Sequence, residues 1–162
     1  MTSGGNIAVI GLGNPIITDD AVGLKIAENI EAMGLPGVDC YKEYVGGLEI
    51  LPLLRGHQFA VIVDAVMTDD YGPGSVMIFD ISDFDNTVHD NPAHGINLAT
   101  AVKIGRRDMP EEMPEEIKFV AVEVSDMVTV SEIMTPAVKA AVKPAENAVL
   151  HVVDSFRSGK TL

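Results

Sequence analysis

The sequence is poor in two kinds of residue that whole classes of function require. It has one cysteine, Cys40, so the chain can form neither an internal disulfide nor a cysteine-rich metal site. Eleven lysines and arginines stand against 24 aspartates and glutamates, which leaves a formal net charge of -13. Nucleic-acid binding and attachment to an anionic membrane both depend on clustered Lys and Arg. We therefore expect neither a nucleic-acid partner nor a membrane partner.

Long apolar segments are also missing. No apolar run reaches 18 residues, and the chain does not start with the basic and then apolar pattern of a signal peptide. A single cysteine suits a reducing compartment. The length of 162 residues fits one domain of ordinary size. We predict a cytoplasmic protein in which residues 1–162 form a single domain with a flexible start at residues 1–5.

Segments typical of strands alternate along the chain with segments typical of helices. The apolar runs at residues 7–13 and 59–64 are typical of strands buried on both faces. Apolar residues at positions 22, 26, 30 and 33 predict a helix with one core-facing stripe. The pattern predicts further strands at 38–44, 75–80 and 117–124, and further helices at 48–54, 94–105 and 136–152.

This alternation predicts the fold class. The loop between the strands at 59–64 and 75–80 is too short for a crossover helix, so we expect these two strands to be antiparallel. The remaining strands are separated by helices, which favours parallel pairing. We predict an α/β three-layer sandwich, in which a mixed, mostly parallel, twisted sheet of about five strands carries helices on both faces.

A glycine-containing turn follows the first strand, where phosphate-binding loops also occur. The dinucleotide fingerprint needs a third glycine at the position of Ile16. Asp19 and Asp20 follow, and their charges would repel a pyrophosphate. We therefore expect no nucleotide cofactor, and we interpret Gly11 and Gly13 as residues that permit a tight turn and close packing.

Two carboxylates and one imidazole are predicted to lie near each other. Asp20 follows the first strand, and Asp64 ends the most hydrophobic strand. Ligands of open α/β sheets bind at the carboxyl ends of the strands. His94 lies at the mouth of a helix, from which its ring can reach the same cleft. This donor set suits a divalent transition metal. A turn or helix cap remains an alternative role for Asp20, and an ordinary polar position remains one for His94.

The sequence offers no obvious nucleophile. It has no Gly-x-Ser-x-Gly elbow, and no motif surrounds Cys40. His57 and His151 have the sequence surroundings of surface or helix-end residues. Asp19 is either a base beside Asp20 or a cap of the following helix, and we favour the cap.

Five short motifs follow one another along nearly the whole chain. They are GLGNPIITDDAVG at 11–23, the glycine pair at 46–47, VIVDA at 61–65, PAHGINL at 92–98 and MTPAV at 134–138. In this order and spacing they resemble the motifs of the hydrogenase maturation proteases, the endopeptidases that trim the large subunit of nickel-iron hydrogenases. Pro15 and Ala21 depart from the pattern, since an aliphatic residue and a glycine are common at these positions.

The resemblance implies a function and a set of site residues. Asp20, Asp64 and His94 match the three metal-contacting positions of the family. The implied reaction removes the C-terminal extension of a nickel-loaded large-subunit precursor, with the substrate's nickel as the recognition element. The nickel is carried by the substrate, although other divalent ions can occupy the same residues. Whether the ion only marks the substrate or also polarises the scissile carbonyl or a water stays open.

An alternative function uses the same three residues. A nickel-dependent chaperone would hold the immature large subunit without cutting it, and the sequence does not separate this activity from proteolysis. We favour the peptidase as the expected function.

Overall fold

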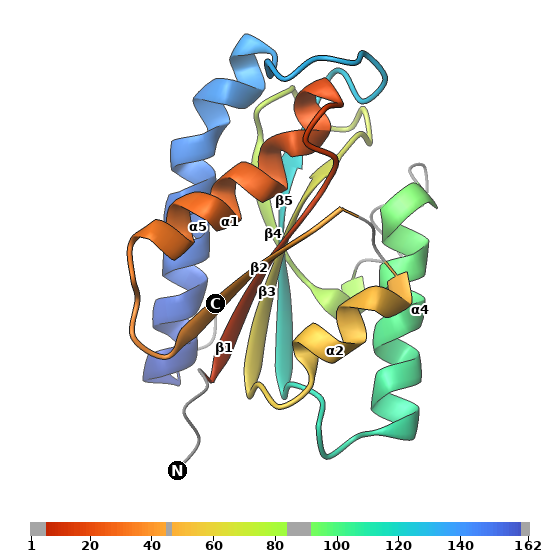
Figure 1. The fold of residues 1–162 in the computed structure, drawn as a ribbon, viewed down its shortest axis with the longest axis vertical. Helices are drawn as coiled ribbons and strands as arrows, with labels where there is room; N and C mark the ends of the chain where they lie inside the picture. The colour runs from red at the N-terminus through yellow and green to blue at the C-terminus, as the bar shows by residue number, and fades with distance from the viewer. Residues whose placement is uncertain (1–5, 45–46, 84–91, 160–162) are drawn as a thin grey trace.

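The computed structural model describes residues 6–44, 47–83 and 92–159, and within the last range it describes the side chains from residue 98 onward. Figure 1 shows a twisted sheet between two layers of helices. The predicted flexible start, residues 1–5, lies outside the described residues.

Five strands form one mixed sheet in the order β2-β1-β3-β5-β4. The pairs β1–β2, β1–β3 and β3–β5 are parallel, and β4 is antiparallel to β5. The predicted α/β fold with a mixed, mostly parallel sheet is therefore confirmed. The strand bounds are β1 Ile7–Leu12, β2 Val38–Glu43, β3 Phe59–Val66, β4 Val76–Asp80 and β5 Glu116–Glu123.

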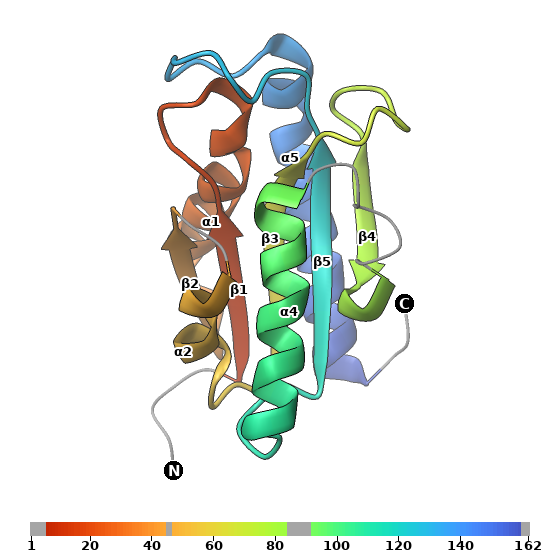
Figure 2. The same cartoon turned by 90° about the vertical axis from the view of Figure 1, so that its right-hand side faces the viewer.

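Helices cover both faces of the sheet, as predicted. Figures 1 and 2 show α1 and α5 on one face and α2 and α4 on the other. None of the helices in the described part of the chain combines the length and the apolar character needed to span a bilayer. The α-helices are α1 Val22–Ala32, α2 Leu51–Leu54, α4 Pro92–Asp108 and α5 Pro136–Ser158, and the 3-10 helices are η1 Thr18–Ala21, η2 Gly47–Ile50 and η3 Ile81–Asp83.

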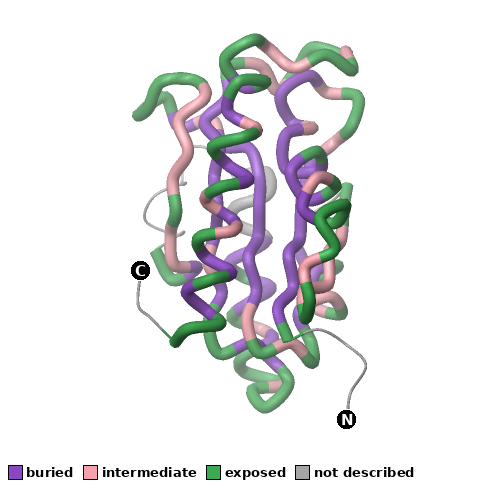
Figure 3. Tube along the Cα trace, turned by 90° about the vertical axis from the view of Figure 1, so that its left-hand side faces the viewer, coloured by how far each residue is buried: buried purple, intermediate pink, exposed green. Residues whose placement is uncertain are grey.

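The apolar side chains of the strands form two cores, one on each face of the sheet. Along β3, Val61 and Val63 pack with α1 and α5, whereas Ile62 and Val66 pack with α2 and α4. Successive strand residues point to opposite faces, so a strand covered on both sides needs an unbroken apolar run. Figure 3 shows this burial along the strands between the partly exposed helices.

Strand β4 does not pair with β3, the strand that precedes it in the sequence. It is antiparallel to β3 in direction, as predicted, but it pairs with β5, which lies between the two. The burial of the two strands explains this order. Almost every residue from Ile117 to Glu123 is buried, whereas every residue of β4 keeps some exposure. A strand that is apolar on both faces suits an interior position, and a partly exposed strand suits the edge.

Helix α1 packs unusually close to β1 and β3 because of glycines. A Cβ at Gly23 would lie 2.4 Å from the Leu12 carbonyl oxygen and 2.5 Å from that of Val63. A Cβ at Gly11 would lie 2.2 Å from the Gly23 carbonyl oxygen. This confirms that the glycines of the first motif permit close packing of strand and helix.

We expect Gly23→Ala to destabilise the protein by about 2 kcal/mol or more, because the added methyl meets two backbone carbonyls that cannot rotate away. The gain in helix propensity, about 1 kcal/mol, is too small to offset this. Urea denaturation followed by circular dichroism measures the loss. In the control Gly72→Ala the added methyl meets no atom within 4 Å, so stability should change by less than about 0.5 kcal/mol. Equal stabilities of the two variants would contradict the packing argument.

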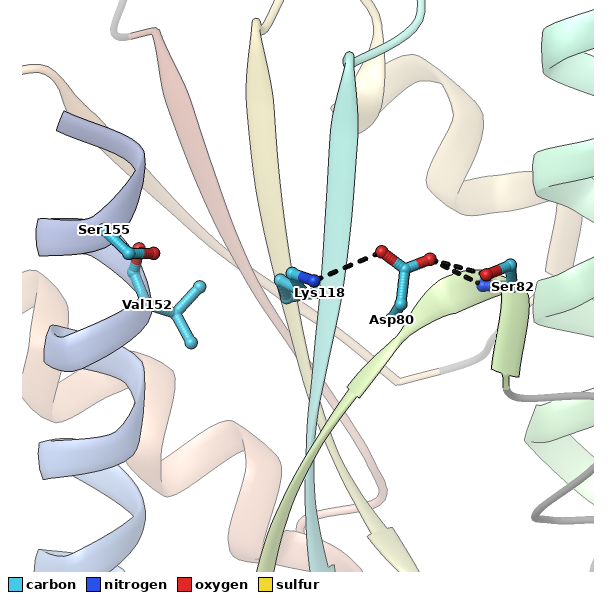
Figure 4. A network of polar contacts seen from close by, with 5 residues as sticks. All are labelled: Asp80, Ser82, Lys118, Val152 and Ser155. Carbon is cyan, nitrogen blue, oxygen red and sulfur yellow. Dashed lines mark hydrogen bonds and ion pairs between the residues drawn. The ribbon is translucent and has the colours of Figure 1, made fainter. Parts of the chain in front are cut away.

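The edge strand β4 is joined to β5 by an ion pair, drawn in Figure 4. Lys118 Nζ lies 3.2 Å from Asp80 Oδ2, and the backbone N–H and hydroxyl of Ser82 donate to Asp80 Oδ1. Burial acts to raise the pKa of Asp80, but the hydrogen bonds from Ser82 and Lys118 outweigh it and lower this pKa below its ordinary value of 3.8.

This pair predicts a pH-dependent contribution to stability. A carboxyl whose pKa is lowered by folding stabilises the protein above its unfolded pKa, and that stabilisation is lost as the pH falls through the folded value. Asp80→Asn should therefore lower the free energy of unfolding at pH 7 by up to about 1 kcal/mol, since the pair is partly exposed. The difference from wild type should shrink towards pH 3 in urea titrations. A difference that stays constant between pH 7 and pH 3 would exclude the ion pair as its cause.

Candidate functional site

The carboxyl ends of β1 and β3 form the natural binding position of this sheet. The chain leaves β1 towards β2 on one side, and it leaves β3 towards β5 and β4 on the other. Neighbouring parallel strands whose connections diverge in this way leave a crevice between them, where α/β proteins bind their ligands. Asp20 follows β1 and Asp64 lies in β3, so both predicted carboxylates belong to this position.

Asp20 lies in the 3-10 turn between β1 and α1 and is 7% exposed. Its backbone N–H donates to the Ile17 carbonyl, and its own carbonyl accepts from the N–H of Asn14. Gly13 makes this turn possible, because its φ is +152° and a Cβ there would lie 1.9 Å from the Asp20 carbonyl oxygen. The turn is in contact with β3, the strand that carries Asp64.

Asp64 is buried within β3, with 1% of its surface exposed. The predicted strand ends at Asp64, but β3 continues through Val66, because β5 pairs with it as far as Glu123. The Asp64 Oδ1 atom accepts the backbone N–H of Ala65 at 2.8 Å. Strand alternation puts Asp64 on the face of Ile62 and Val66, which is the face covered by α2 and α4.

His94 lies in the first turn of α4, and its side chain is outside the described part of the structure. Figure 2 shows that α4 begins near the end of the sheet where β1 and β3 end. Helix α4 packs through Leu98 and Ala101 on the face to which Asp64 belongs. The backbone therefore brings the start of this helix to the same end of the sheet as Asp20 and Asp64.

The described side chains provide neither a metal-binding cluster nor a reactive cysteine. No group of three or more His, Cys, Asp or Glu side chains suited to a metal ion occurs among the described side chains, which do not include that of His94. Burial, together with Glu31 and Asp39, raises the pKa of the Cys40 thiol to about 11. The thiolate is the reactive form, so Cys40 is a poor nucleophile near neutral pH.

Asp19 has a role that the sequence analysis did not foresee. It is fully buried and caps neither η1 nor α1, so the predicted cap is wrong. Its carboxylate accepts the backbone N–H groups of Ser125, Asp126 and Thr135, at 3.2, 3.1 and 2.7 Å. The Thr135 hydroxyl lies 2.9 Å from both carboxylate oxygens. Asp19 thus fastens the loop between β5 and α5 to the turn that carries Asp20.

Glu123 is a further buried carboxylate that the sequence analysis missed. It is 1% exposed and pairs in register with Val66, so it lies on the same face of the sheet as Asp64. Its oxygens accept the backbone N–H of Thr68 at 2.9 Å and the Thr68 hydroxyl at 2.5 Å. Glu123 therefore holds the start of the loop that leaves β3. The sequence did contain a signal for this residue, because Glu123 is an acidic residue inside a segment predicted to be a strand.

His57 follows the end of α2, which agrees with the helix-end alternative, but its ring is covered and does not lie on the surface. Its side chain is 8% exposed, and its Nε2 atom lies 2.9 Å from Asp39 Oδ2. The ring meets Tyr41 edge to face, with 5.9 Å between the ring centroids. His57 precedes β3, so it lies at the opposite end of the sheet from Asp20 and does not belong to this site. His151 is exposed on α5, as predicted.

We expect Asp19→Ala to destabilise the protein by about 3 kcal/mol or more. The change leaves three partly buried backbone N–H groups without their acceptor, and an unsatisfied group costs about 1–3 kcal/mol where it is kept from water. Chemical denaturation measures the loss, and hydrogen exchange should show lost protection at Ser125, Asp126 and Thr135. The control Asp70→Ala removes an exposed carboxylate and should change stability by less than about 0.5 kcal/mol. Unchanged protection in Asp19→Ala would refute the fastening role.

A family model and a curated relative both match this chain. The family model described as hydrogenase maturation protease matches residues 45–152, which is more than half of the chain. The hydrogenase 2 maturation protease of Escherichia coli K12 is 29% identical over 150 residues, covering 89% of this chain and 88% of that protein.

Solved structures show the same similarity in three dimensions. The hydrogenase maturating endopeptidase HybD from Escherichia coli superposes with a TM-score of 0.74 at 27% identity, over 93% of each chain. The nickel-iron hydrogenase maturation protease HybD from Thermococcus kodakarensis shares the fold, with a TM-score of 0.68 at 22% identity over 91% of this chain and 98% of that one. This chain belongs to the hydrogenase maturation protease family and is an endopeptidase of that family.

Proposed function

We propose that this endopeptidase removes the C-terminal extension of a nickel-iron hydrogenase large-subunit precursor, and that Asp20, Asp64 and His94 contact the nickel which the precursor carries. The observation that supports this most directly is the position of Asp20 and Asp64. Both are buried at the carboxyl ends of neighbouring strands, and the turn bearing one contacts the strand bearing the other.

The donor set fits a nickel ion presented by a substrate. Two carboxylate oxygens and one imidazole nitrogen suit a divalent late transition metal, and three ligands leave positions for the groups that hold the ion in the precursor. The carboxylates are also well positioned by the fold. Asp64 belongs to a central strand and Asp20 to a turn with fixed backbone hydrogen bonds, and sites on such elements are more precise than sites on free loops.

In this function the chain's own residues bind and orient. Asp20, Asp64 and His94 recognise the nickel, so that only a loaded precursor is held with its extension in the crevice. Burial of the two carboxylates excludes water and strengthens their attraction to a cation. A divalent ion held there polarises a nearby carbonyl or lowers the pKa of a bound water. Membership of a protease family supports cleavage over the alternative of a non-cutting chaperone.

The test is a cleavage assay on a nickel-loaded precursor, read as a shift in gel mobility. We expect Asp20→Asn, Asp64→Asn and His94→Gln each to lower the cleavage rate by more than about 100-fold, because each removes a contact to the ion. The free energy of unfolding of Asp64→Asn should stay within about 1 kcal/mol of wild type, since the amide oxygen can still accept the Ala65 N–H.

Matched controls lie on the exposed surface of α5. Asp154→Asn and His151→Gln make the same chemical changes at exposed positions and should cleave at the wild-type rate. Precursor without nickel should remain uncut by every variant. Wild-type rates in folded Asp20→Asn or Asp64→Asn would refute the proposed contacts, and equal cleavage of nickel-free precursor would refute nickel recognition.

A further inference from the structure

Four large aliphatic side chains are exposed together beside the candidate site. Ile16 lies in the turn after β1, and Val128, Val130 and Ile133 lie in the loop between β5 and α5. The exposed fractions are 49% for Ile16 and 84%, 72% and 75% for Val128, Val130 and Ile133. Single exposed aliphatic residues are common, but a cluster of them marks an interaction surface. We call these four residues the apolar loop surface.

Hydrogen bonds join the two segments of this surface. The N–H of Ser131 donates to the Ile16 carbonyl at 2.9 Å, and the N–H of Thr18 donates to the Ser131 carbonyl at 3.0 Å. Ile17 forms bridges with Val130 and Ser131. The Thr18 hydroxyl donates to the Thr129 carbonyl. The aliphatic side chains are therefore carried by backbone that is bonded across the two segments.

The ends of the loop are also anchored. Asp19 accepts N–H groups from both ends, at Ser125 and Thr135. Met127 and Met134 turn inward and pack against the core beneath α1 and α5. A loop that is already ordered loses little conformational entropy when a partner covers it, which favours binding.

The position of the surface links it to the site. Figures 1 and 2 both show the loop at 125–135 beside the turn at 13–21, at the end of the sheet where β1 and β3 finish. Asp20 follows directly on Thr18 and Asp19, which hold the loop. A protein seated on the apolar loop surface would therefore lie beside Asp20.

Charge indicates the kind of partner. The loop segment 125–135 contains Asp126 and Glu132 and no Lys or Arg. The turn at 13–21 also lacks Lys and Arg, and its two aspartates, Asp19 and Asp20, are buried. The chain as a whole carries a formal net charge of -13. A second copy would bring like charges together on this face, which disfavours self-association. The complementary surface is an apolar patch flanked by Lys or Arg.

We propose that the apolar loop surface docks the folded body of the immature hydrogenase large subunit. This inference rests on the proposed function, because it takes that precursor as the substrate. It adds a second contact, separate from the nickel and the extension, through which the endopeptidase recognises the protein that it processes. Apolar burial at this surface supplies affinity, and the neighbouring acidic residues Asp126 and Glu132 orient the partner.

The experiment titrates the nickel-loaded precursor against Val128→Ser, Ile133→Ser and the double variant. Each single change should raise the half-saturating precursor concentration about tenfold, and the double change should raise it by more than about 30-fold. The cleavage rate at saturation should stay at the wild-type value, because the three proposed nickel contacts are unchanged. Binding to immobilised precursor, measured without turnover, should weaken by the same factors.

The matched control is Met33→Ser at the C-cap of α1, which should change neither value. Met33 is 39% exposed and does not belong to the core-facing stripe in which the sequence placed it. Wild-type half-saturation in the double variant, with Asp20→Asn still inactive, would overturn the docking surface alone. Failure of the wild type to bind or cut any loaded precursor would overturn the proposed function and this inference with it. Light scattering that shows a wild-type dimer and a monomeric double variant would assign the surface to a second copy instead.

Discussion

The end of the sheet that carries the candidate site depends on one buried carboxylate. Asp19 accepts backbone N–H groups from both ends of the loop between β5 and α5, up to 116 positions further along the chain. Hydrogen bonds to a charged acceptor are stronger than bonds between neutral groups, and the Asp19 side chain is itself fully buried. The turn after β1 and the loop after β5 therefore form one unit, although they belong to opposite ends of the sequence.

Two adjacent aspartates have different roles in this unit: Asp19 binds the loop, and Asp20 is the proposed metal contact. In a 3-10 helix, successive side chains point about 120° apart, so Asp19 can face the loop while Asp20 faces another direction. Gly23 lets the start of α1 lie close to β1 and β3, and this fixes the distance of the preceding 3-10 helix from the sheet. Since the same turn bonds to the loop and contacts β3, the position of Asp20 is set by tertiary contacts on two sides. A proposed metal-contacting residue gains its precision from a neighbour that has only a structural role.

Local sequence patterns predicted the strands and helices, whereas the roles of individual polar side chains depend on non-local contacts. The apolar runs of β1 and β3 and the stripe on α1 follow from periodicity, which needs only neighbouring residues. The placement of Asp20 and Asp64 at one edge of the sheet also followed, because the carboxyl ends of neighbouring parallel strands share that edge. The role of Asp19 did not follow from the sequence, since its hydrogen-bond partners lie more than 100 positions away along the chain. The burial of His57 depends likewise on Asp39 and Tyr41 in another strand.

The order of the strands decides which segments lie at the carboxyl end of the sheet. Because β5 lies between β3 and β4, the chain that leaves β3 must cross the end of β5 before it can enter β4. Glu123 holds this crossing at both ends, since its side chain bonds to Thr68 and its backbone bonds to Gly74 and Ser75. A direct hairpin between β3 and β4 would leave the end of β5 uncovered. The crossing at residues 67–75 and the loop fastened by Asp19 instead rise from the same edge of the sheet as Asp64, so the strand order that buries this carboxylate also builds the segments around it.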